Sequence, residues 1–87
     1  MHISQAPTGI NFVIETERAV YIGRMGKTNG DQVSLHHAMA FPVNATDNTE
    51  DVIRKTARYG IPVQHEEIQL ASQGILRIRK LGDVPKA

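Results

Sequence analysis

An Asn-Gly pair, Asn29-Gly30, separates two runs of alternating apolar and polar residues and restricts the fold of this chain more than any other feature. Both residues tolerate the positive φ angles that a tight hairpin turn requires. The run before the pair covers residues 20–25, and the run after it covers residues 32–42. The second run ends at Pro42, which cannot donate a hydrogen bond to a central ladder. The pattern predicts an antiparallel hairpin with a long second strand.

Three further segments have the period-two pattern of half-buried strands. Residues 10–16 precede the hairpin and connect to it through a short turn at 17–19, so they form a second antiparallel pair. Residues 67–71 and 75–81 are separated by a glycine-containing turn and form the last hairpin. Gly23 lies inside a predicted strand, and a glycine in such a place indicates a bulge or a sharp bend.

One helix is expected between the third and the fourth strand. Residues 46–51 contain several N-cap formers and acidic side chains, which suit the positive end of a helix dipole. Apolar residues then recur at spacings of three and four as far as Tyr59, and Gly60 followed by Pro62 ends the pattern. The predicted helix covers about residues 49–59.

The chain has 87 residues and no cysteine, which predicts one small domain without disulfides or thiolate metal sites. Five short strands and one helix have too little apolar surface for two packed sheets, whereas a sheet that closes on itself has no free edges. We therefore expect a mainly β domain, a small and strongly bent five-stranded antiparallel barrel. Residues 10–81 would form the barrel, residues 1–9 an arm and residues 82–87 a flexible tail.

Gly23 in the second strand and the short glycine-containing turn between the last two strands resemble the Sm-like barrel, which is a Src-homology-3-like fold, in outline. The final turn of that family contains Arg-Gly, whereas this chain has Gln73-Gly74. The RNA-binding loop of that family ends Asp-x-x-Met-Asn, whereas this chain has Lys27-Thr28-Asn29-Gly30-Asp31. The N-terminal helix of the family is also missing. The resemblance therefore implies a barrel, and we transfer no base-binding residue from Sm proteins.

Five short patterns follow one another along most of the chain. They are Val-Ile-x-Thr at 13–16, Val-x-x-Gly at 20–23, Val-x-Leu-x-x-Ala at 33–38, Ala-x-x-Gly-Ile at 57–61 and Glu-Ile-x-Leu at 67–70. In their order and spacing the chain resembles a group of small, uncharacterised phage and prophage proteins, although it lacks tryptophan. The resemblance implies a phage-like origin and no mechanism. The sequence has no apolar run of signal-peptide or membrane-span length, so we expect the cytoplasm of a bacterial host and no membrane partner.

Catalytic and metal-binding patterns are not recognisable. His36 and His37 are adjacent, so in a strand they point to opposite faces, and His37 is expected to be half-buried on the core face. The run at 65–67 supplies one histidine and two glutamates, whereas a metal site needs three or four converging ligands. There is no Gly-x-Ser-x-Gly, and the glycines at 23–27 lack the P-loop spacing. We expect no enzyme, no metal and no cofactor.

Basic residues indicate a binding surface instead, because cations contact phosphates and aromatic rings stack on bases. Arg77 and Arg79 leave one face of the last strand, and Lys80 extends that run. The predicted nucleic-acid-binding residues are Tyr21, Arg24, Lys27, Arg77, Arg79 and Lys80. In the alternative interpretation, Arg77 and Arg79 pair with cross-strand carboxylates such as Glu67, or are solvated.

Four apolar residues, Val13, Met25, Ile75 and Leu81, fall on faces opposite to the expected core. One helix is too small to cover them all, so we expect a homo-oligomer, and a closed ring would also remove free strand edges. The expected function is a non-enzymatic, phage-like binding module for single-stranded RNA or DNA. The alternative is a phage accessory protein that blocks or sequesters a host protein or a nucleotide ligand.

Overall fold

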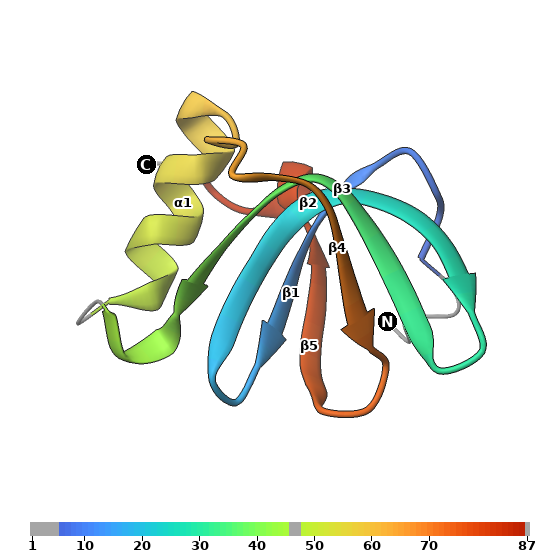
Figure 1. Cartoon of the computed structure of the whole chain (residues 1–87). Helices are drawn as coiled ribbons and strands as arrows, with labels where there is room; N and C mark the ends of the chain where they lie inside the picture. Colours follow the sequence, from blue (N-terminus) through green and yellow to red (C-terminus); the bar gives the residue numbers. More distant parts are fainter. Residues whose placement is uncertain (1–5, 46–47, 87) are drawn as a thin grey trace.

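The computed structural model describes residues 6–45 and 48–86 of the chain (Figure 1). These residues form one sheet of five antiparallel strands: β1 (Asn11–Thr16), β2 (Ala19–Asn29), β3 (Gln32–Pro42), β4 (His65–Ala71) and β5 (Ile75–Lys80). Their spatial order is β4-β3-β2-β1-β5. The helix α1 (Thr49–Tyr59) follows β3 and the short 3-10 helix η2 (Val43–Ala45), and η3 (Leu81–Asp83) follows β5. The predicted mainly β class with five antiparallel strands is confirmed.

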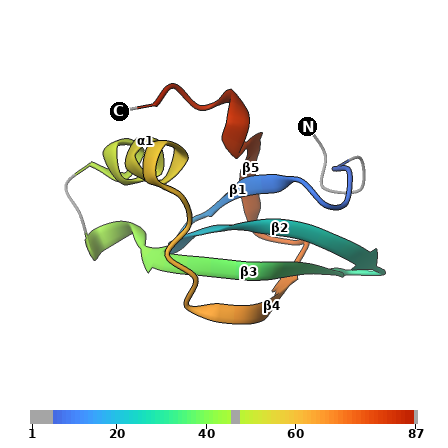
Figure 2. The same cartoon turned by 90° about the horizontal axis from the view of Figure 1, so that it is seen from above.

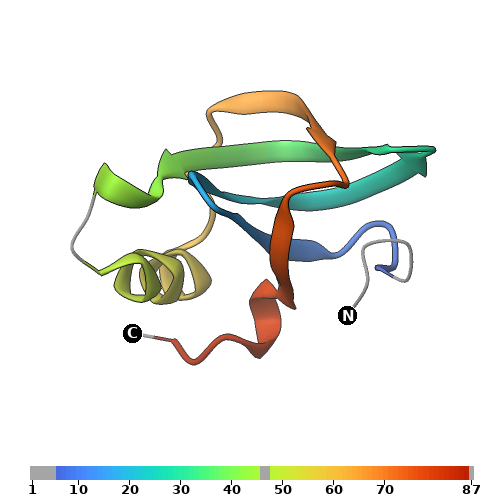
Figure 3. The ribbon, with the colours of Figure 1, turned by 90° about the horizontal axis from the view of Figure 1, so that it is seen from below.

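The sheet is open, so the prediction of a closed barrel is wrong in this respect. Within the described residues β4 pairs with β3, β5 pairs with β1, and the two outer strands do not pair with each other. The turn at residues 72–74 connects β4 to β5. The two strands diverge from this turn because β4 pairs with β3 at one edge of the sheet and β5 pairs with β1 at the other. Figures 2 and 3 show β4 and β5 on opposite sides of β2 and β3.

A bulge in β3 bends the central hairpin opposite Gly23. Residues 22–24 of β2 pair with residues 36–39 of β3, so β3 contains one additional residue at this point. A Cβ atom at Gly23 would lie 2.7 Å from the Cβ of Ala38, and glycine avoids that contact. The predicted bend at Gly23 is confirmed. His37 has a φ of 50° in the bulge and is exposed rather than half-buried, because the additional residue shifts the alternation of β3.

The predicted hairpin turn between β2 and β3 is also present. Asn29 pairs with Gln32, so the two residues at the tip are Gly30 and Asp31. Gly30 has a φ of 59°, a conformation that glycine adopts without crowding a Cβ atom. The tip therefore lies one residue further along the chain than the Asn29-Gly30 pair alone indicated.

Local capping defines both ends of α1. Asn48 is the N-cap, and its Oδ1 accepts a hydrogen bond from the backbone N–H of Asp51 at 3.1 Å. At the other end, the N–H of Gly60 donates to the carbonyl of Thr56 at 2.9 Å, with a φ of 96° at the glycine. The helix covers the residues that the sequence predicted. Thr46 and Asp47, which contributed to the predicted N-terminal signal, lie outside the described residues.

Two apolar clusters bury both faces of the sheet. The first lies on one face of the sheet and contains Phe12, Ile14, Met25, Val33, Leu35, Ala38, Leu70 and Ile78. The second lies beneath α1 and contains Val13, Val20, Ile22, Met39, Ile53, Leu81 and Val84. The helix and the C-terminal segment therefore cover the second face within one chain.

This double burial corrects the argument for self-association. Val13, Met25 and Leu81 were expected to point outward, but they are 0%, 1% and 7% exposed. Ile75 is partly buried against the first cluster. These four residues therefore do not require a second copy of the chain to cover them.

The ends of the domain also differ from the predicted arm and tail. Val84 is 4% exposed and its N–H donates to the carbonyl of Leu81 at 3.1 Å, so the chain packs on the sheet as far as residue 84. Gly9 donates to the carbonyl of Met25 at 2.8 Å, which attaches the end of the predicted arm to β2. Residues 1–5 and residue 87 lie outside the described residues.

Candidate functional site

The two arginines of β5 belong to a cluster of four charged side chains. Arg77 donates from Nε and Nη2 to both carboxylate oxygens of Glu15, its register partner on β1. Arg79 donates from Nη1 and Nη2 to the carboxylate of Glu50 at 2.9 and 2.8 Å. The Nη2 atom of Arg79 also lies 3.4 Å from Oε2 of Glu15, which joins the two pairs. Two arginines face two glutamates, so the cluster has no net charge.

The cluster attaches the first turn of α1 to the sheet. Hydrogen bonding from Arg79 lowers the pKa of Glu50, with further lowering by the positive charges of Arg79, Arg77 and Arg54. The hydrogen bonds that Arg77 donates to Glu15 raise the pKa of Arg77. The hydrogen bonds that Arg79 donates to Glu50 raise the pKa of Arg79. A phosphate group would have to displace these carboxylates to reach either guanidinium.

The alternative interpretation of the β5 arginines, pairing with carboxylates, is therefore confirmed, but with other partners than Glu67. Glu67 accepts a hydrogen bond from Gln69 instead. Glu50 lies in the predicted helix, and nothing in the local sequence indicates that the helix brings it to Arg79. Glu15 is recognised as the partner of Arg77 only when residues 10–16 are known to pair with the last strand.

Tyr21 and Arg24, two of the predicted nucleic-acid-binding residues, lie on opposite faces of β2. Tyr21 pairs with Ile14 and packs against the first cluster. Arg24 is exposed and pairs with Asn11 on β1 and His36 on β3. Side chains three positions apart on a strand point in opposite directions, so these two do not form one site.

The remaining predicted residues are also separated. Tyr21 lines a shallow groove with Arg18, Leu70 and Leu76, where the ends of β4 and β5 diverge. Lys80 is half-buried and pairs with Phe12. The structure therefore does not bring the six predicted residues together.

We use the name β2–β3 surface for four polar residues of the central hairpin, Arg24, Lys27, His36 and His37, of which Arg24 and His36 are register partners. Arg24 and Lys27 are exposed and form no ion pair within residues 6–45 and 48–86. Lys27 lies at a second irregularity of register, between residues 25 and 28 of β2. These cations are available to an anionic ligand without displacing a carboxylate.

The imidazole of His36 lies against the backbone of β2. A Cβ atom at Gly26 would be 2.5 Å from Nε2 and 2.6 Å from Cδ2 of this ring. Glycine at this position therefore makes room for the imidazole beside Arg24, the register partner of His36. The sequence analysis missed this role of His36, because register and the close approach of Gly26 are both properties of the paired strands.

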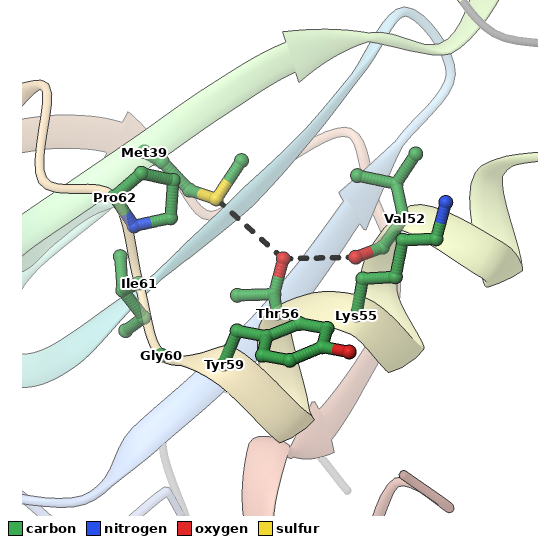
Figure 4. A pocket seen from close by; sticks show the side chains of 8 residues that line it. All are labelled: Met39, Val52, Lys55, Thr56, Tyr59, Gly60, Ile61 and Pro62. Carbon is green, nitrogen blue, oxygen red and sulfur yellow. Dashed lines mark hydrogen bonds between the residues drawn. The ribbon is translucent and has the colours of Figure 1, made fainter. Parts of the chain in front are cut away.

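A second candidate surface is the apolar groove between α1 and the loop that follows it (Figure 4). Its lining consists of Met39, Val52, Lys55, Thr56, Tyr59, Gly60, Ile61 and Pro62. The hydroxyl of Thr56 donates to the carbonyl of Val52 at 2.8 Å and contacts Sδ of Met39 at 3.8 Å, as Figure 4 shows. Tyr59 is 74% exposed, and its ring is 5.2 Å from the guanidinium carbon of Arg58.

No protein-family model matches this chain, and no curated protein is significantly similar to it. In the described part of the chain, no three histidine, aspartate or glutamate side chains are arranged to hold a metal ion. Nor does that part contain a helix long and apolar enough to cross a membrane.

Proposed function

We propose that this chain is a non-enzymatic, phage-like binding module of the bacterial cytoplasm that contacts single-stranded RNA or DNA through the β2–β3 surface. The observation that carries the proposal is the pair of exposed cations, Arg24 and Lys27, that no carboxylate neutralises within the described residues. Lys/Arg side chains without such partners attract phosphates and release the counterions of the nucleic acid.

In this proposal the predicted residues contribute to nucleic-acid binding to different extents. Arg24 and Lys27 contact phosphates directly. Arg77 and Arg79 contribute to binding when a phosphate replaces Glu15 or Glu50, which costs the hydrogen bonds of the cluster. Two phosphate contacts give weak binding with a shallow salt dependence, about −1.4 in log K against log salt for a single strand. Engagement of all four cations would double that slope to about −2.8.

The same proposal includes an Sm-like barrel that is open between β4 and β5, and a homo-oligomer. The strand order β4-β3-β2-β1-β5 and the bend at Gly23 support the barrel relationship. The outer edges of β4 and β5 are unpaired among the described residues, and unpaired edges favour association with another strand. Leu76, 70% exposed on β5, lies at one of these edges.

The groove beside α1 favours a second candidate function, the blocking of a host protein. Tyr59 at its rim is 74% exposed and Val63 in the following loop is 56% exposed. Tyrosine side chains commonly anchor protein–protein interfaces. Such binding would depend on Tyr59 and only slightly on salt.

Fluorescence anisotropy with a labelled single-stranded oligonucleotide tests the main proposal. We expect binding in the micromolar range at low salt, where non-specific binders typically have dissociation constants of about 1–100 µM. The double variant Arg24→Glu with Lys27→Glu should lose this binding. The charge-matched control, Arg18→Glu with Lys86→Glu, changes two other exposed cations and should retain most of it. No binding by the wild type at about 50 µM protein, or equal losses in both variants, would overturn the proposal.

A further inference from the structure

The hairpin tip between β2 and β3 contains a reactive dipeptide that the proposed function does not use. Asn29 is the last residue of β2, and Gly30 follows it with a φ of 59°. Residues 27–32 are all exposed. Figure 1 shows the tip at the end of the molecule opposite α1. Water and hydroxide therefore reach both residues without crossing the apolar clusters.

The atoms that would react are not held by other contacts. Among residues 6–45 and 48–86, the backbone N–H of Gly30 donates no hydrogen bond, and the side-chain amide of Asn29 forms none. A Cβ atom added at Gly30 would meet nothing within 4 Å. Asn29 and Gln32 form the last register pair of the hairpin, and pairs at such an end open at little cost in free energy. Opening of this pair allows the nitrogen of Gly30 to reach the side-chain carbonyl carbon of Asn29.

We infer that Asn29 is a site of spontaneous deamidation, which converts an amide at the hairpin tip into a carboxylate. The backbone nitrogen of Gly30 attacks Cγ of Asn29 and forms an N–Cγ bond, while the Cγ–Nδ2 bond breaks and ammonia leaves with the proton of the Gly30 nitrogen. Water then opens the cyclic imide at either of its carbonyls and gives aspartate or isoaspartate. Glycine favours the first step, because it is conformationally permissive and has no side chain to crowd the attacking nitrogen.

The other three asparagines of the chain provide an internal comparison. All four asparagines are exposed, so exposure does not distinguish them. Asn11, Asn44 and Asn48 are each followed by a residue with a side chain, which hinders the attack. The Oδ1 of Asn48 also accepts a hydrogen bond from the N–H of Asp51 in the N-cap of α1. We therefore expect Asn29 to react well before the other three.

The reaction changes the charge of the tip and, for isoaspartate, its backbone. Either product lowers the formal net charge of the chain from +1 to zero, and the new carboxylate is two residues from both Lys27 and Asp31. Isoaspartate also inserts an additional carbon into the main chain, which disturbs the register of residue 29 with Gln32. A negative charge beside Lys27 weakens the attraction of phosphates. This consequence for binding rests on the proposed function, whereas the deamidation itself does not.

Peptide mass spectrometry of the full chain, incubated at neutral and at mildly alkaline pH, tests the assignment. We expect the mass increase of an amide-to-acid conversion in the peptide that contains Asn29. It should appear faster at the higher pH, because hydroxide removes the proton of the Gly30 nitrogen. Asn29→Gln should abolish the increase, since a longer side chain has to close a larger ring, whereas the matched control Asn44→Gln should retain it. The folded protein should react within about tenfold of the rate of the chain unfolded in urea, because the tip opens easily.

Deamidation of the urea-unfolded chain alone would show that the hairpin protects Asn29 and would overturn the inference, as would an equal rate at Asn44. The variant Asn29→Asp carries the product charge from the start and should bind a single-stranded oligonucleotide more weakly than the wild type at low salt; equal affinity would refute the consequence for binding. The mass measurement uses no nucleic acid. A chain that deamidates at Asn29 but binds no oligonucleotide would therefore overturn the proposed function and leave this inference standing.

Discussion

Replacing Gly23 with alanine is expected to destabilise the sheet at its bend. The new Cβ would lie 2.7 Å from Ala38 Cβ and 3.1 Å from both Ala38 Cα and the carbonyl oxygen of His36. These atoms belong to backbone or to a side chain without rotamers, and Ala38 is 0% exposed, so the two strands must move apart. Overpacking of this kind costs about 1–3 kcal/mol. In a domain of this size each kcal/mol lowers the melting temperature by about 4–8 °C.

Two controls make the Gly23→Ala experiment specific. Gly82→Ala adds the same methyl group where nothing lies within 4 Å, and its stability should stay within about 0.5 kcal/mol of the wild type. Gly23→Ala combined with Ala38→Gly removes the shortest contact and should be more stable than the sum of the two single changes implies. Thermal and urea unfolding followed by circular dichroism measure all four variants. Wild-type stability of Gly23→Ala, or strict additivity with Ala38→Gly, would refute the steric account of the bend.

Three further predictions concern the ion-pair cluster, the C-terminal segment and the sheet edge. Because Arg79 lowers the pKa of Glu50, the stabilisation by this carboxylate is present above its ordinary value of 4.5 and is lost as pH falls further. In the variant Glu50→Gln the melting temperature should therefore fall less steeply than in the wild type as the pH is lowered. A fall as steep as that of the wild type would contradict the pairing of Glu50 with Arg79. Val84→Asp places a carboxylate at a site that is 4% exposed and should lower the melting temperature strongly, whereas a flexible segment would tolerate it. Leu76→Glu should reduce the mass seen by light scattering without loss of stability, and a wild-type mass of 9.6 kDa at all concentrations would exclude the proposed oligomer.

The features that the sequence predicted correctly depend on residues close together in the chain. The hairpin turn at Gly30 needs one residue that tolerates positive φ, and α1 needs an N-cap and a terminating glycine, Gly60. The bend at Gly23 was predictable for the same reason, since a glycine inside a strand indicates a bulge. Such signals act within a few residues and do not depend on the rest of the fold.

The errors concern contacts between distant segments. The alternation that placed His37 on the core face fails because the additional residue of the bulge lies on β3, which only strand pairing reveals. Val13 and Leu81 were assigned to an uncovered face because the sequence does not show where α1 and the C-terminal segment pack. For the same reason, the sequence does not reveal that Glu50 is the partner of Arg79, which is 29 residues away in the chain.

Amide chemical-shift mapping tests the proposed interface most directly. A single-stranded oligonucleotide is titrated into the uniformly ¹⁵N-labelled protein at low salt, and the shifts of assigned backbone amides are followed. The account predicts that the largest changes occur at Arg24, Lys27, His36 and His37, and that they diminish as salt is added. Changes centred on Arg77 and Arg79, or on Tyr59 beside the α1 groove, would contradict it, as would a spectrum that the oligonucleotide leaves unaltered.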